Sequence, residues 1–246
     1  CDPCCMPQYM DMNMGMRGLL DANDPKDPIY FHHTLHDHTT GAIGDTEAHA
    51  LVRLFYTPEH HMHAGMGVSA PTGDVGIKLR DTHGIESGMI HYGMQIGSGT
   101  WDAKPSLTYT GQFQDWFWGA QGSATIRLED KNESGYALGD VYSATAWGGY
   151  RISDSLSATV RGLYTHEGEI HGGFTQTFIP LGPNDYVNNY GGTFVDIGVG
   201  ISVSLPDESF KKNSFSLEWL QPVMTDANGY QLDRVGTLAA SWKLAF

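Results

Sequence analysis

The sequence predicts an all-β protein, an antiparallel transmembrane β-barrel, from three observations. The chain ends in an alternating segment that places Leu238, Trp242 and Phe246 on one face and Ser241 and Lys243 on the other. The same period of two recurs in segment after segment, often with aromatic residues near the segment ends. No run of about 18 apolar residues is present, so no helix is predicted to cross a bilayer, whereas barrel strands hide their apolar content in alternation.

Composition agrees with one large domain of this kind. The 246 residues include 31 glycines, 11% aromatic residues and only 17% charged residues. A secreted soluble β-sandwich or barrel is the alternative, but it leaves the repeated aromatic alternation unexplained.

Ten strands are expected, an even number that suits a closed antiparallel barrel. One strand alternates with particular regularity, with valine, isoleucine and leucine outward from Val195 to Leu205 and Asp196, glycine and serine inward. The expected strands are Tyr9–Leu19, Thr46–Tyr56, His61–Ala70, Ser106–Phe113, Asp115–Leu128, Gly139–Tyr150, Leu156–His166, Thr193–Leu205, Asn213–Val223 and Val235–Phe246. Gly88–Gly99 is either a further short strand or, as we favour, part of a loop.

The connections between these strands alternate in length, as short periplasmic turns and long external loops do in outer-membrane barrels. The long loops are 20–45, 71–105, 129–138, 167–192 and 224–234, and together they carry −11 of the net charge of −14. Such a surface attracts cations and repels nucleic acid. An equally good interpretation of the acidic residues is that they only keep the loops soluble.

Residues 1–8 are expected to form a periplasmic N-terminal segment, and residues 9–246 the barrel. The three cysteines, Cys1, Cys4 and Cys5, all lie in that first segment. We favour a disulfide among them or with other residues. A lipid anchor on Cys1 and a metal site at Cys4 or Cys5 stay open.

A methionine row lies in the first expected strand, at alternate positions from Met10 to Met16. Thioethers are soft ligands suited to Cu(I), so the row resembles a copper path. If it faced the lumen, however, Asp11 and Arg17 would face lipid, where a charge costs about 2–4 kcal/mol near the midplane. We therefore expect the methionines, with Met62 and Met66 by the same argument, to face outward.

Histidines are the stronger metal signal, because imidazole binds Cu(II), Zn and Ni. The candidate ligands lie in two external loops: His32, His33, His36 and His38 in the first, and His83, His91, Met89 and Met94 in the second. His60, His61 and His63 form a further candidate group at a periplasmic turn. Polar loop residues at a titratable surface are the plainer interpretation of all of them.

The predicted lumen carries a nearly balanced set of charges, together with His49. Its members are Arg17, Arg53, Arg127, Arg161, Lys243, Asp11, Glu47, Asp196 and Glu218. In a narrow barrel these side chains either fill the lumen or select the ions that pass. No GxSxG, HExxH or P-loop motif is present, so no catalytic residues and no enzymatic activity are expected.

Several short motifs, taken in order, resemble a known family. They are Thr39-Thr-Gly-Ala-Ile-Gly-Asp45, Val68-Ser-Ala-Pro-Thr-Gly73, Met94-Gln-Ile-Gly-Ser-Gly-Thr-Trp-Asp102, Trp118-Gly-Ala-Gln and Ala144-Thr-Ala-Trp147. Together they look like bacterial outer-membrane barrels described as transporters and related to the phenol-degradation meta-pathway (MetA-type) barrels. The resemblance implies a twelve-stranded barrel, and in some members a link to copper or other metals. It supplies no catalytic residues, and the ten strands counted here depart from it.

The expected function is therefore passage or surface capture of small solutes in the outer membrane of a Gram-negative bacterium, as in a porin. Metal cations such as copper are the leading candidate solutes, and copper or another divalent metal is the one candidate cofactor. Outer-membrane lipid is the expected surrounding. The alternative is a plugged scaffold barrel that contacts a partner protein through its N-terminus or its external loops.

Overall fold

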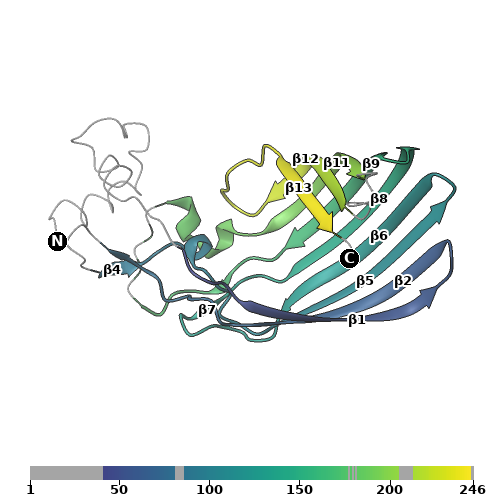
Figure 1. The fold of residues 1–246 in the computed structure, drawn as a ribbon. Helices are drawn as coiled ribbons and strands as arrows, with labels where there is room; N and C mark the ends of the chain where they lie inside the picture. The colour runs from purple at the N-terminus through teal and green to yellow at the C-terminus, as the bar shows by residue number, and fades with distance from the viewer. Residues whose placement is uncertain are drawn as a thin grey trace.

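The computed structural model describes residues 41–80, 86–176, 178, 180, 182–204 and 213–244. Nine long strands of this part form one antiparallel sheet, in the order β1-β2-β5-β6-β8-β9-β11-β12-β13. Their bounds are β1 Thr46–Tyr56, β2 His60–Ala70, β5 Asp102–Phe113, β6 Trp116–Arg127, β8 Val141–Ser153, β9 Leu156–Glu167, β11 Gly192–Ser204, β12 Asn213–Ala227 and β13 Thr237–Leu244. Each strand pairs with its neighbours along the chain, which is the up-and-down order of a barrel wall. Figure 1 shows the sheet curling into a trough.

Nine of the ten expected strands are confirmed, and the tenth, Tyr9–Leu19, lies outside the described residues. Within those residues, β1 and β13 are the two edges of the sheet and are not paired with each other. The expected start of β5 at Ser106 is corrected to Asp102, which brings Lys104 into the sheet. In place of one strand over Gly88–Gly99, the chain forms a small hairpin of β3 (Lys78–Arg80) and β4 (Glu86–Met89), followed by the 3-10 helix η1 (Tyr92–Met94).

One face of the sheet is apolar. Large side chains at alternate positions of the central strands, such as Leu107, Val160 and Val199, are 45–58% exposed in the isolated chain. Soluble monomers rarely expose continuous apolar surface on this scale. Lipid is the environment in which such a face is stable. Among the described residues, no helix is both long and apolar enough to cross a membrane.

Aromatic side chains border this apolar face at both ends. Near the short turns the rings of Trp116 and Tyr150 lie 4.9 Å apart between centroids. Near the long loops, Tyr142 and Tyr164 are exposed on the same face. On β8, Tyr150 follows Tyr142 by eight positions, about 26 Å along the strand at about 3.3 Å per residue. At a barrel tilt of about 40°, this is about 20 Å along the axis, close to the apolar band of an outer-membrane barrel.

The long connections gather at one end of the sheet, as Figure 1 shows. They contain β7 (Tyr136–Ala137), which pairs with β10 (His171–Gly172), and the 3-10 helices η2 (Pro183–Asp185) and η3 (Val187–Asn189). Three of these connections share an aromatic cluster around Tyr92, Tyr136 and Ile170. The Tyr92 ring stacks on Phe174 at 4.3 Å between centroids and meets Tyr136 edge-on at 4.9 Å. The described parts of these loops therefore form a packed unit, which we call the loop cluster.

Candidate functional site: the polar face of the sheet

The second face of the sheet is polar, and in a closed barrel this is the face that lines the lumen. Its β11 positions are Asp196, Gly198, Gly200 and Ser202, which alternate with exposed apolar residues such as Val199. The predicted orientation of this strand is confirmed. The structure also places Met62 and Met66 on the apolar face, because they share a face of β2 with Ala64, which is in register with the exposed Leu107 of β5.

Most of the predicted lumen charges that the structure describes are engaged in ion pairs. Glu47 pairs with Lys104 and Arg127 with Asp102. The Arg161 Nε lies 2.9 Å from the Glu218 Oε1. The Arg234 Nη2 lies 3.0 Å from an oxygen of Asp196, a side chain that is only 2% exposed.

The remaining predicted charges have other surroundings. The Arg53 guanidinium lies 5.5 Å from the centroid of the Tyr56 ring. Lys243 lies on β13 in register with Ser214, and Arg17 and Asp11 fall outside the described residues.

Three members of these pairs were not predicted from the sequence as lumen charges: Asp102, Lys104 and Arg234. The first two were assigned to a loop because β5 was started too late. Arg234 belongs to the connection between β12 and β13, and only the folding of that loop brings it to Asp196. The one signal in the sequence for Asp102 and Lys104 is the alternation of strand residues, which continues back through Pro105.

Glycines on the polar face let side chains meet across a strand. Arg161 of β9 and Glu218 of β12 are separated by β11, which carries Gly198 and Gly200 between them. A Cβ on Gly198 would lie 3.1 Å from the Glu218 Oε1 and 3.3 Å from the Arg161 Cβ. Because these positions have no side chain, the ion pair can bridge the strand.

Glycines on neighbouring strands also set the orientation of two aromatic rings. Trp147 on β8 pairs with Gly119 on β6, and Phe117 on β6 pairs with Gly149 on β8. A Cβ on either glycine would overlap the ring opposite it. Each ring therefore lies against the backbone of the neighbouring strand and extends little from the polar face of the sheet.

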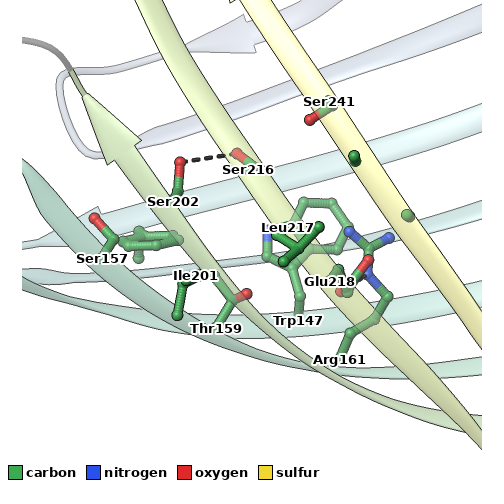
Figure 2. Close-up of a pocket in the computed structure, with 13 residues that line it drawn as sticks. Trp147, Ser157, Thr159, Arg161, Ile201, Ser202, Ser216, Leu217, Glu218 and Ser241 are labelled. Atoms are coloured by element: carbon green, nitrogen blue, oxygen red, sulfur yellow. Dashed lines mark hydrogen bonds and ion pairs between the residues drawn. The ribbon is translucent and has the colours of Figure 1, made fainter.

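These groups border an open concavity of about 350 Å³ on the polar face. Its residues come from β6, β8, β9, β11, β12 and β13, and they include both rings and the Arg161–Glu218 pair. Figure 2 shows Trp147 and Arg161 beside Glu218, with Ser157, Ser202 and Ser216 toward the other end of the concavity. The guanidinium carbon of Arg161 lies 5.6 Å from the Trp147 ring centroid.

The predicted metal ligands lie in different environments. The His91 Nδ1 contacts the Asp185 Oδ1, a bond that ties η1 to η2. Met89 is 2% exposed, and Met94 ends η1. His32, His33, His36, His38 and His83 fall outside the described residues. In the described part of the chain, no group of three or more His, Cys, Asp or Glu side chains is placed to hold a metal ion.

The histidines at the first short turn are divided between the two faces. The His60 Nδ1 lies 2.9 Å from the Tyr109 hydroxyl, on the face that also carries Trp118. His61 stacks on Tyr56 at 4.2 Å between ring centroids. Because neighbours in a strand point to opposite faces, His60 and His61 do not converge on one ion.

At the loop end, Asp45 fastens two segments of the long connection after β2. Its carboxylate accepts hydrogen bonds from the Gly73 N–H at 2.9 Å and from the Ser98 N–H and hydroxyl at 2.8 and 2.7 Å. Burial raises the pKa of Asp45, but these hydrogen bonds outweigh it and hold the pKa below its usual value. Burial raises the pKa of Tyr136 to about 12, so the loop cluster contains a neutral phenol.

Comparison with known proteins supports the fold. No family model matches the chain, and no curated protein matches it. Among solved structures, the crystal structure of an outer membrane channel from Pseudomonas putida F1 matches with a TM-score of 0.53 and 14% sequence identity. The match covers 81% of this chain and 65% of that channel, which is less than two thirds of its length.

The chain thus shares the all-β, antiparallel barrel fold of that outer membrane channel. The family expected from the sequence motifs is supported at the level of an outer-membrane barrel. The link to MetA-type barrels and the link to copper stay predictions.

Proposed function

We propose that this protein is an outer-membrane channel for small solutes, with lipid on its apolar face and the solute path along its polar face. The observation that carries the proposal is the contrast between the two faces of one sheet. The lipid-type face has exposed aliphatic residues bordered by aromatic rings, whereas the opposite face has charges compensated in pairs. The similarity to a solved outer membrane channel supports the same conclusion.

The polar face is suited to a water-filled path. Ion pairs such as Arg127–Asp102 and Arg161–Glu218 hold charged side chains against the wall. Glycines at Gly119, Gly149 and Gly198 keep rings and long side chains close to the backbone. A passive conduit of this kind needs no nucleophile, and we propose no catalytic role.

The test is solute entry into proteoliposomes. Purified protein is reconstituted, and swelling rates are measured for a series of neutral solutes of increasing mass, with protein-free liposomes as the control. A channel predicts swelling that falls steeply with solute mass, and single-channel currents in planar bilayers. Folded protein that gives neither swelling nor current would favour the alternative, a plugged scaffold barrel with a protein partner.

We further propose metal cations, copper among them, as candidate cargo concentrated at the external loops. The net charge of −11 on the five expected long loops supports this, since acidic loops attract cations. Calorimetry with copper and zinc should show binding that is lost when His32, His33, His36 and His38 are replaced by alanine. Heat changes that are equal in the two proteins would remove these histidines from the proposal.

A further inference from the structure

Four serines form a straight row across the polar face. In the strand register, Ser202 of β11 lies opposite Ser157 of β9 and Ser216 of β12, and Ser216 lies opposite Ser241 of β13. The hydroxyl oxygens of Ser202 and Ser216 are 2.8 Å apart. With about 4.8 Å between strands, the row extends about 14 Å along one side of the concavity. Each hydroxyl both donates and accepts hydrogen bonds.

The two charged groups that line the concavity beside this row, Arg161 and Glu218, cancel each other. The Arg161 Nε lies 2.9 Å from the Glu218 Oε1, and the two side chains are 36% and 18% exposed. A guanidinium has five N–H donors and a carboxylate accepts several hydrogen bonds, so both retain capacity for a ligand. The site therefore offers strong donors and acceptors with no net charge.

Two aromatic rings complete the concavity. Phe117 and Trp147 lie against Gly149 and Gly119, and both belong to its lining. Flat rings of this kind present apolar surface to the C–H face of a ligand. Hydroxyls, a neutral ion pair and aromatic surface thus meet in a space of about 350 Å³, which is within the usual size of a small-molecule site.

We propose that this concavity is a binding subsite for a neutral polyhydroxylated solute, of the sugar or polyol class. This inference rests on the proposed channel function and adds a neutral substrate class to the cations proposed at the external loops. A charged solute gains no net attraction from the charged residues that line the concavity, because Arg161 and Glu218 already compensate each other. An apolar solute would leave the serine row and the ion pair without the hydrogen bonds that water gives them. A solute rich in hydroxyl groups satisfies both and can stack on the rings.

The test is sugar binding to detergent-solubilised protein, which does not require an open channel. Isothermal titration calorimetry with glucose and maltose is compared with titration by the charged analogues glucuronate and glucosamine. The variants are Ser202→Ala with Ser216→Ala, and Trp147→Ala beside the conservative Trp147→Phe. The matched control replaces Ser143 and Thr145, which lie on β8 and do not line the concavity, by alanine and valine.

The proposal predicts binding of the neutral sugars in preference to both analogues. Removing two neutral hydrogen bonds should weaken binding about tenfold. Trp147→Ala should weaken it further, whereas Trp147→Phe and the control should bind like the wild type. The proposal is overturned if neutral sugars fail to bind, or if the control loses as much affinity as the serine variant. Channel current without sugar binding would overturn the subsite alone, and sugar binding without current would overturn the channel alone.

Discussion

Ion selectivity should shift in opposite directions when either member of the Arg161–Glu218 pair is neutralised. Glu218→Gln leaves a positive charge on the channel wall, and Arg161→Gln leaves a negative one. For an ion about 5 Å away in a water-filled lumen, one unit charge contributes about 0.8 kcal/mol. This corresponds to about a fourfold change in local ion concentration, and salt screening lowers it to about two- to fourfold.

The assay is the reversal potential of planar bilayers under a potassium chloride gradient. Glu218→Gln should move the potential toward anion preference and Arg161→Gln toward cation preference. Asp115→Asn is the matched control, because Asp115 and Arg151 form an exposed pair 3.9 Å apart at a short turn. Its shift should be smaller. Shifts of the same sign in both pair variants, or no shift in either, would refute the placement of this pair on the ion path.

Three further predictions concern the loop cluster, the glycines of the polar face and the effect of pH. Tyr136→Ala should cost about 3–5 kcal/mol of loop-cluster stability, since this ring is fully buried, and limited proteolysis should then cut the long loops while the sheet persists. Gly200→Val should lower the melting temperature and the free energy of unfolding, the latter by about 1–3 kcal/mol. The reason is that a Cβ at position 200 would lie 2.7 Å from the Thr159 hydroxyl. The lowered pKa of Asp45 stabilises the folded loop above the unfolded pKa, about 3.9, and this stability is lost as pH falls through the folded pKa. Hydrogen-exchange protection of the Ser98 amide should therefore fall in acid, and Asp45→Asn should remove that dependence.

Each of these predictions has a matched comparison. Tyr136→Phe keeps the buried ring and should leave the loops resistant to protease. Gly122→Ala is the control for Gly200→Val, because a Cβ there meets nothing within 4 Å. Unchanged proteolysis of Tyr136→Ala would contradict the packed loop cluster. Equal melting temperatures for the two glycine variants would contradict the crowding at Gly200.

The strands and their two faces were predictable because apolar and polar residues alternate with a period of two within each segment of the sequence. Val199 and Ile201 alternate with Gly200 and Ser202, and the structure places the two sets on opposite faces. The start of β5 was not predictable in this way, because Pro105 cannot donate to a ladder and is typical of a strand boundary. The β5–β6 register is the same on both sides of the proline, from the Ala103–Ile126 pair to the Ser106–Ser123 pair, although Lys104 and Pro105 are not paired with β6.

The loop cluster and the serine row could not be predicted from the sequence for a different reason. Tyr92, Tyr136 and Phe174 come from three separate loops, and no periodicity links residues that meet only by tertiary packing. The serine row depends on the register of four strands, and a slip of one residue would turn a serine to the other face. The Arg161–Glu218 pair has the same dependence, although the alternation alone placed both residues on the polar face.

The assignment of one face to lipid and the other to water is tested most directly by thiol labelling in proteoliposomes. Cys1, Cys4 and Cys5 are first replaced by serine, and Ile201→Cys and Ser202→Cys are then compared as neighbouring positions on β11. A hydrophilic, membrane-impermeant maleimide should label the Ser202→Cys variant and spare the Ile201→Cys variant, because only a thiol in water ionises to the reactive thiolate. Equal labelling of both variants by the hydrophilic reagent would contradict a membrane-spanning sheet with a water-filled polar side.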